Sequence, residues 1–165
     1  MFKAIRDERV DPMTEVMLMW AARRQHIVNL IEPALKRGEI VICDRFIAST
    51  FAYQIYGRGM DKTTCFDPFL DLVMNGLWPD KTIILDVSPE VGSARALARG
   101  ALDRLEGERL DFFERVRGGY KAYANLDRQC VVIDSSGTMA EVFASVREQV
   151  RSILPALERA APAMA

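Results

Sequence analysis

The sequence has few residues that could bind a metal through histidine or cysteine. His26 is the only histidine among 165 residues, and the three cysteines, Cys43, Cys65 and Cys130, are widely spaced. A zinc site needs several such ligands at short spacing, and a disulfide framework needs paired cysteines in a short chain. We therefore expect reduced, structural thiols and no multi-histidine metal site.

Long hydrophobic runs and an excess of positive charge are also lacking. No apolar run approaches the ~20 residues of a membrane-spanning helix, and the N-terminus shows no signal-peptide pattern. The formal net charge is -1, and the arginines between positions 95 and 117 are offset by acids nearby. Nucleic-acid-binding domains usually carry a net-basic surface. These absences predict a single cytoplasmic domain, residues 1–165, that binds neither membranes nor nucleic acid.

Three apolar runs predict strands, at residues 40–43, 82–87 and 131–134. Helical patterns separate the runs, and this alternation indicates an α/β fold with a parallel sheet and flanking helices. The run at 40–43 is uninterrupted, which is typical of a parallel strand covered on both faces.

Start and stop signals outline the helices. Asp11-Pro12 is typical of an N-cap followed by proline at the first helical position, and we expect Pro33 to bend this long helix and Gly38 to end it. Asn75-Gly76 ends a second amphipathic segment that begins near residue 64. Thr138 and Glu141 predict a capping box that starts the last helix.

Polar residues follow the run at 40–43 directly. Asp44-Arg45 comes first, and Ser49-Thr50 and Tyr53-Gln54 follow at tight spacing. In open α/β sheets the ligand crevice lies beyond the carboxyl ends of the strands. We therefore expect Asp44 and Arg45 at the floor of an active site.

An ordered set of motifs resembles the bacterial thymidylate kinase family, over about residues 11–153. Asp44-Arg45-Phe46, with the Ser-Thr and Ala-Tyr-Gln groups after it, is similar to the signature that follows the third strand of that family. The other matching blocks are Ala21-Ala22-Arg23-Arg24-Gln25-His26, Gly57-Arg58-Gly59, Pro79-Asp80, Leu85-Asp86-Val87, Asp103-Arg104-Leu105-Glu106 and Phe112-Phe113-Glu114-Arg115-Val116-Arg117.

The resemblance implies a P-loop nucleoside-monophosphate-kinase-like fold and a homodimer. It also implies phosphoryl transfer from ATP to dTMP with Mg²⁺, giving dTDP and ADP for dTTP biosynthesis. Chemistry of this kind depends on positioning and charge neutralisation.

The resemblance also implies residue roles. Arg45 would bind the dTMP phosphate bidentately, and Asp44 would lie near Mg²⁺, acting through a water. Arg23 would hydrogen-bond the thymine base. The nucleoside pocket would be lined by Ser49, Thr50, Tyr53 and Gln54.

A lid segment at about residues 95–109 would close arginines over the phosphates. Those arginines are Arg95, Arg99 and Arg104, and Leu97 stands where the family commonly has another.

Simpler structural readings stand beside these roles. Asp44 and Arg45 could form a structural ion pair, although the flanking signature favours function. The lid arginines could belong to a solvated charged helix, and Arg23 to a solvated helix face. Asp86 could cap the helix that follows it, and we assign it no catalytic role.

The chain departs from the family pattern at its start. The family's Gly-x-x-x-x-Gly-Lys-Ser/Thr loop, which holds the ATP phosphates, is absent, because the first glycine is Gly38. Its Arg-Glu-Pro-Gly-Gly-Thr segment is absent too. The family's first strand lies between the strands that correspond to 40–43 and 82–87, so we expect these two strands to pair directly, another segment to fill the gap, or the chain to be a fragment.

Two smaller departures concern the base. Met19 stands where the family has an aromatic residue against thymine, and Ile55 replaces a common glycine.

Three hypotheses follow from this pattern. The first is a thymidylate kinase sequence whose N-terminal region is missing, through truncation or a misplaced start codon. The second is a non-catalytic dTMP-binding remnant or degenerate paralogue. The third, which the ordered motifs favour least, is a kinase of another nucleoside monophosphate.

Overall fold

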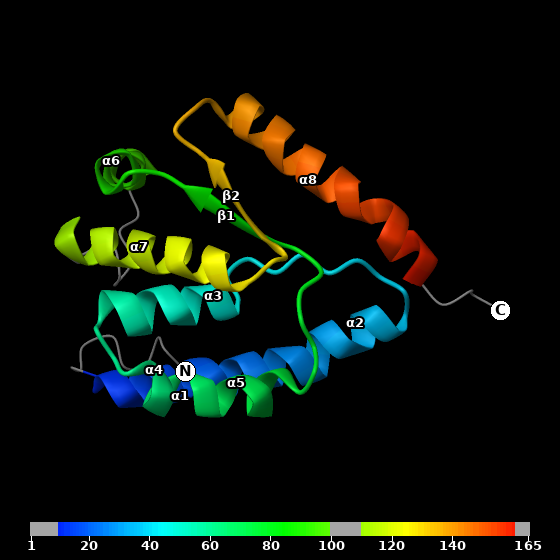
Figure 1. Cartoon of the computed structure of the whole chain (residues 1–165), viewed down its shortest axis with the longest axis horizontal. Coiled ribbons are helices and arrows are strands. Elements are labelled where there is room, and N and C mark those ends of the chain that lie inside the picture. Colours follow the sequence, from blue (N-terminus) through cyan, green and yellow to red (C-terminus); the bar gives the residue numbers. More distant parts are fainter. Residues whose placement is uncertain (1–9, 100–109, 161–165) are drawn as a thin grey trace.

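The structure is a computed structural model that describes residues 10–99 and 110–160, with side chains described for 10–95 and 110–155. Figure 1 shows helix α8 on one side of two short strands and helix α7 on the other, with α6 near the arrowhead end of the strands and the helices of residues 12–74 beyond α7. The elements are α1 (Pro12–His26), η2 (Ile27–Ile31), α2 (Glu32–Lys36), α3 (Ile47–Thr50), η3 (Phe51–Gly57), α4 (Lys62–Cys65), α5 (Asp67–Met74), β1 (Thr82–Asp86), α6 (Pro89–Arg99), α7 (Leu110–Leu126), β2 (Cys130–Asp134) and α8 (Met139–Ala160).

The first helical run begins and ends as predicted. The Asp11 side chain accepts a hydrogen bond from the backbone N–H of Thr14 at 2.9 Å, and Pro12 is the first helical residue. Gly38 follows the run with a φ of 77°, a left-handed conformation that glycine adopts at little cost. At Pro33 the helical run restarts, because the π-helical turn η2 separates α1 from α2 and Pro33 lies in the first turn of α2.

Two of the three predicted strands form a parallel sheet. β1 and β2 pair in the register Thr82↔Cys130 to Asp86↔Asp134. Ile84 and Ile133 are buried, whereas Leu85 is 52% exposed. The α/β class with a small parallel sheet is therefore confirmed, but β1 is not the fully covered strand that its apolar sequence suggested.

The strand predicted at residues 40–43 is wrong. In Figure 1 the chain between α2 and α3 carries no arrow, and the only strand pairing among the described residues joins β1 to β2. Ile40 is 62% and Ile42 93% exposed. A strand requires a hydrogen-bonded neighbour, and this segment does not pair with β1, so direct pairing across the gap does not occur.

The hydrophobic core lies among the helices rather than at the sheet. Trp20 of α1 is 1% exposed, and its ring lies 5.4 Å from that of Phe66. Phe66 in turn lies 5.3 Å from Phe51 of η3. The Trp20 Nε1–H donates to the backbone oxygen of Cys65 at 3.0 Å, so the buried indole has a polar partner.

The amphipathic segment near residue 64 forms two helices, α4 and α5, with Phe66 between them. It ends as predicted at Asn75 and Gly76, whose φ angles are 47° and 80°. The capping box of α8 is also confirmed, because the backbone N–H of Thr138 donates to Glu141 at 2.8 Å and that of Glu141 to the Thr138 hydroxyl at 3.3 Å.

Helix α7 packs closely on η3 because Gly119 has no side chain. A Cβ placed at Gly119 would lie 2.7 Å from the Cβ of Tyr56 and 2.8 Å from the Cα of Ala52. Helix α8 makes looser contact with the rest, and its Met139 and Phe143 are 88% and 63% exposed.

The cysteines are free, as expected from their spacing, and Cys65 is buried. In the part of the chain that the structure describes, none of the helices has the length and apolar character needed to cross a bilayer.

Candidate functional site

Asp44 and Arg45 follow the unpaired segment 40–43 and are both exposed. Arg45 has a φ of 65°, in the left-handed region that few residues other than glycine adopt. Such backbone strain costs about 1–3 kcal/mol and clusters at functional sites. Within the described ranges no ion pair joins Asp44 to Arg45, so the structural alternative for these two residues is not formed here.

The Arg45 side chain lies over an aromatic ring. Its guanidinium carbon is 5.5 Å from the ring centroid of Tyr53. Burial acts to lower the pKa of Arg45, but Tyr53, Tyr120 and Asp44 outweigh it and raise that pKa. The group is therefore a persistent cation, which suits the binding of a phosphate.

Arg23 reaches from α1 to the start of α3. Its Nη1 donates to the Thr50 hydroxyl at 2.6 Å and its Nη2 to the Phe46 backbone oxygen at 3.0 Å. The guanidinium also lies 5.4 Å from the Trp20 ring and 5.5 Å from the Phe46 ring. Burial lowers the pKa of Arg23 to about 10, so it remains charged at neutral pH. Arg23 is thus anchored inside the molecule and is not a solvated face residue.

The predicted nucleoside wall lies on α3 and η3. Thr50 and Gln54 are buried, at 2% and 4% exposure, and Tyr53 packs edge-on against Phe112, with ring centroids 6.1 Å apart. The Ser49 hydroxyl hydrogen-bonds the Tyr120 hydroxyl at 2.8 Å. The structure therefore brings Arg23 and Arg45 together with this wall, as their order in the sequence suggested.

Three residues of this region carried no role in the sequence interpretation: Glu15, Arg58 and Tyr120. Gln54 donates to Glu15 at 3.0 Å, and Arg58 forms an ion pair with Glu15 at 3.4 Å. Arg58 belongs to the Gly-Arg-Gly block that the sequence singled out, and Glu15 precedes Arg23 by about two helical turns. Tyr120 had no sequence signal beyond helical periodicity.

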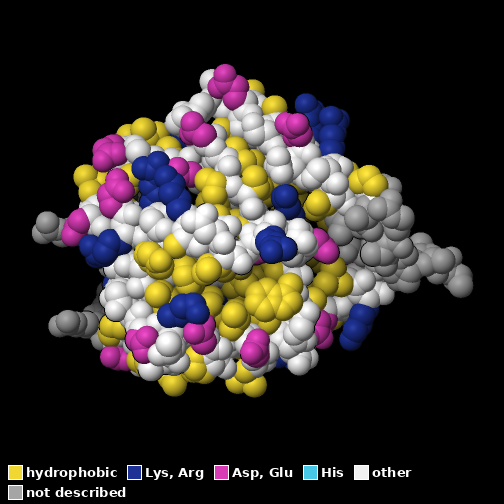
Figure 2. Space-filling model, in the orientation of Figure 1, with side chains coloured by type: hydrophobic (Ala, Val, Ile, Leu, Met, Phe, Trp, Pro, Cys, Tyr) yellow, Lys and Arg dark blue, Asp and Glu magenta, His cyan; other side chains and the backbone are white. Residues whose placement is uncertain are grey.

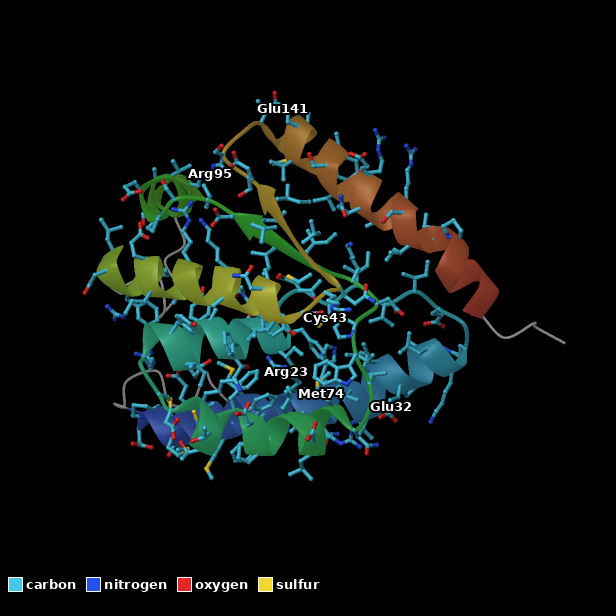
Figure 3. All side chains as sticks on the ribbon, in the orientation of Figure 1. Arg23, Glu32, Cys43, Met74, Arg95 and Glu141 are labelled. Carbon is cyan, nitrogen blue, oxygen red and sulfur yellow. The ribbon has the colours of Figure 1, made fainter. Side chains whose placement is uncertain are left out.

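Arg95 of α6 binds the loop that follows β2. Its guanidinium donates to the backbone oxygens of Ser135, Ser136 and Gly137 at 2.7, 3.0 and 3.1 Å. Figure 3 shows Arg95 near that loop, well apart from Arg23 and Cys43. The side chain of Arg99 and the whole of Arg104 lie outside the described residues, as does most of the predicted lid, so the lid arginines stay a prediction.

Asp86, at the carboxyl end of β1, does not act as a helix cap. It accepts two hydrogen bonds from Arg117 at 2.7 and 2.9 Å and forms an ion pair with Lys121 at 3.2 Å. The Arg117 hydrogen bonds hold the pKa of Asp86 below its ordinary value, despite partial burial. This carboxylate therefore fastens α7 to the sheet.

The described residues fit a magnesium ion that is bound chiefly by substrate. No group of three histidine, cysteine or acidic residues able to hold a metal occurs within residues 10–99 and 110–160. Mg²⁺ usually takes one or two carboxylates together with water and substrate phosphates, and the exposed Asp44 offers one such carboxylate.

A shallow apolar groove lies between α1 and α5, on the side of α1 that faces away from α3 and η3. It is lined by Met17, Trp20, Ala21, Arg24, Phe69, Leu72 and Val73. On the face drawn in Figure 2, hydrophobic side chains also gather in the lower half, over the region between α3 and α5.

Comparisons with known proteins agree on one family. The family model described as "Thymidylate kinase" matches residues 1–146. The thymidylate kinase of Pseudomonas fluorescens strain Pf0-1 is 42% identical over 151 residues, which cover 90% of this chain and 70% of that protein. The thymidylate kinase of a Synechococcus strain is 46% identical over 145 residues, covering 87% of this chain and 68% of that protein. The thymidylate kinase of Teredinibacter turnerae is 48% identical over 121 residues, which cover 73% of this chain and 58% of that protein.

Proposed function

Because the chain belongs to the thymidylate kinase family, we propose that it carries the acceptor side of a site for phosphoryl transfer from ATP to dTMP. The observation that supports this best is the anchoring of Arg23 by Thr50 and the Phe46 carbonyl, beside the wall that also holds Arg45 and Gln54. A guanidinium so anchored keeps further N–H groups for a ligand oxygen, since arginine has five donors.

In the proposed reaction, an oxygen of the dTMP phosphate attacks the γ-phosphorus of ATP. The bond from that phosphorus to the bridging oxygen breaks, giving dTDP and ADP. Arg45 binds the attacking phosphate bidentately and offsets its charge. Arg23 hydrogen-bonds the base, and Ser49, Thr50, Tyr53 and Gln54 line the nucleoside pocket.

Mg²⁺ would neutralise charge on the ATP phosphates, with Asp44 holding one of its water ligands. Arg95, Arg99 and Arg104 would belong to the lid segment of about residues 95–109, within a single domain. Such lid arginines stabilise the charge that spreads over the transferred group.

The proposed fold is that of a P-loop nucleoside-monophosphate kinase without the first strand and phosphate loop within these 165 residues. The exposure of Ile40 and Ile42, and the edge of β1 that has no partner strand among the described residues, support a sheet that is incomplete as it stands.

A coupled assay of ADP release with dTMP, ATP and Mg²⁺ tests the kinase activity directly. Dependence of ADP release on both nucleotides supports it, and dTDP should form in equal amount. Calorimetry with dTMP and with ATP–Mg²⁺ separates the two sides of the site.

The second candidate is a non-catalytic dTMP-binding protein, which the absence of a Gly-x-x-x-x-Gly-Lys-Ser/Thr loop from the sequence favours. Selective dTMP binding without turnover supports it, and any ATP-dependent dTDP formation eliminates it.

The proposed working form is a cytoplasmic homodimer. Exposed apolar side chains on the helices, among them Met17 and Leu72 at 51% and 72% exposure, give such a pair a surface to bury. Sedimentation at micromolar concentration tests this, and a monomer alone contradicts it.

A further inference from the structure

We infer that Glu15 is a positioning residue that selects the nucleobase by fixing the orientation of the Gln54 side-chain amide. This inference rests on the proposed function, in which Arg23 hydrogen-bonds the base of the acceptor nucleotide and Gln54 lines the nucleoside pocket. Glu15 itself touches neither substrate, because it acts through Gln54.

The contact is buried, and it joins a neutral amide to a carboxylate. Glu15 is 7% and Gln54 4% exposed, and the Gln54 Nε2 donates to the Glu15 Oε1 at 3.0 Å. Arg58 approaches both carboxylate oxygens, with Nε 3.4 Å from Oε1 and Nη2 3.4 Å from Oε2. A carboxylate buried to this degree is costly unless it is paired, so the three side chains form one unit.

This unit allows only one orientation of the amide. As the acidic partner of Arg58, Glu15 is a carboxylate, which accepts hydrogen bonds and donates none. The Gln54 Nε2 must therefore face Glu15, and Oε1 must face away from it. A glutamine without such a neighbour can turn its amide over and exchange a donor for an acceptor.

The Gln54 Oε1 is an open acceptor. In the described part of the chain it accepts no hydrogen bond, and no fully buried side-chain oxygen there lacks a partner. The Oε1 atom is therefore reachable from the solvent. It is held in place, and a ligand can supply its donor.

The Gln54 acceptor and the Arg23 guanidinium lie along the same contact between α1 and the α3–η3 run. Glu15 and Arg23 both project from α1 toward the α3–η3 run, where Gln54 pairs with the first and Thr50 with the second. Thr50 and Gln54 are four residues apart, about one helical turn. A base lying along this seam would meet arginine donors at one end and a fixed carboxamide oxygen at the other.

Thymine and cytosine present opposite groups to such a pair. Thymine offers an N3–H donor beside a carbonyl oxygen, which complements the Gln54 Oε1 and the Arg23 donors. Cytosine offers a bare N3 acceptor beside an amino donor, so both contacts are mismatched. Each unsatisfied polar group in a closed site reduces binding about 10- to 100-fold.

Calorimetry with dTMP and dCMP, on wild type and on Glu15→Gln, tests the inference. A glutamine at position 15 can donate as well as accept, so the Gln54 amide becomes free to turn. We expect the ratio of dTMP to dCMP affinity to fall at least 10-fold. Weakening of both nucleotides by the same factor indicates a merely structural role and overturns the inference.

Two further variants provide the controls. Glu15→Asp retains an acceptor-only carboxylate, so the affinity ratio should stay within about threefold of wild type even if both affinities fall. Glu39→Gln removes the acid of an exposed ion pair with Arg37 and should leave both affinities unchanged. A collapsed ratio in Glu15→Asp contradicts the inference.

The proposed function and this inference fail in different ways. Folded wild type that binds neither nucleotide overturns both. Selective dTMP binding with an unchanged ratio in folded Glu15→Gln overturns only the role of Glu15.

If Glu15→Gln does not fold, side-chain amide exchange in the wild type decides. One Nε2 proton of Gln54 must exchange more slowly than those of the exposed Gln25. Equal exchange overturns the inference.

Discussion

Two regions of this molecule differ in how well their side chains are buried and hydrogen-bonded. They are the helical side, around α1, α3 and η3, and the strand side, around β1 and the segment 40–43. Around α1, α3 and η3, the buried Trp20 and the partly buried Arg23 both have hydrogen-bond partners. Around β1 and the segment 40–43, Leu85 and Ile42 remain exposed, and one edge of β1 has no strand beside it in the described structure. The proposed acceptor side of the site therefore lies on the part of the fold whose side chains are buried and hydrogen-bonded.

Truncating the core of the helical side should have the largest effect on stability. Trp20→Ala removes a 1% exposed ring together with its hydrogen bond to Cys65, and we expect the free energy of unfolding to fall by about 3–5 kcal/mol. Phe143→Ala, on α8 at 63% exposure, should change it by less than about 0.5 kcal/mol. Urea unfolding of both variants measures the contrast, and similar losses would remove the distinction between the two sides.

Overpacking at the contact between α7 and η3 should cause the next largest loss in the free energy of unfolding. Gly119→Ala places a Cβ within 2.8 Å of the backbone of Ala52, so we expect a loss of up to about 3 kcal/mol. Gly118→Ala is the matched control, because a Cβ there meets nothing within 4 Å. It should stabilise α7 by up to about 1 kcal/mol, since alanine is the better helix former. Thermal unfolding should shift in opposite directions.

Removing the Asp86 carboxylate tests how firmly the strand side is attached to α7. Asp86→Asn should lower the free energy of unfolding at pH 7 by about 2 kcal/mol, since two charged hydrogen bonds from Arg117 weaken. The pKa of Asp86 is lowered in the folded state, so its contribution is complete above the ordinary aspartate value of about 3.9. It is lost as pH falls through the lower folded pKa.

The difference between wild type and Asp86→Asn should therefore disappear in acid. Unfolding curves from pH 7 to pH 2 measure it. Asp80→Asn, at an exposed position just before β1, is the control and should match wild type throughout. A difference that stays constant from pH 7 to pH 2 contradicts the assignment.

Replacing Arg23 should affect binding more than stability. Arg23→Lys keeps the charge but cannot reach Thr50 and the Phe46 carbonyl with a planar fork, so we expect dTMP affinity to fall at least about 10-fold. Arg24→Lys alters the neighbouring arginine, which binds the Val73 carbonyl at 3.2 Å on the α5 side, and should leave that affinity unchanged. Calorimetry with dTMP measures both.

The smallest effect should come from the unpaired segment. Ile42→Thr changes a side chain that is 93% exposed, and the free energy of unfolding should stay within about 0.5 kcal/mol of wild type. Ile27→Thr, at a position with 0% exposure, should cost several times as much. Equal effects of the two substitutions would show that the segment 40–43 is covered in solution.

Local signals in the sequence predicted local structure well. The cap at Asp11, the stop at Gly38 and the capping box at Thr138 all formed, because each depends on neighbours within a few residues. The segment 40–43 has the composition of a buried strand, but a strand depends on a distant partner that composition does not reveal.

The site divides in the same way. Arg23, Arg45 and the wall were predicted from motifs and lie together in the structure, whereas the link between Glu15 and Gln54 joins residues 39 apart and left no pattern in the sequence.

Helix α7 touches the sheet and the acceptor wall within one helical turn. Arg117 binds Asp86 at the end of β1, and Tyr120, three residues later, binds Ser49. The backbone hydrogen bonds of a helix keep its length fixed, so α7 connects β1 to Ser49 as a rigid element. A displacement of β1 along the axis of α7 would thus move the Tyr120 hydroxyl, so the hydrogen bond that Ser49 makes in the predicted nucleoside wall depends on how the sheet is held.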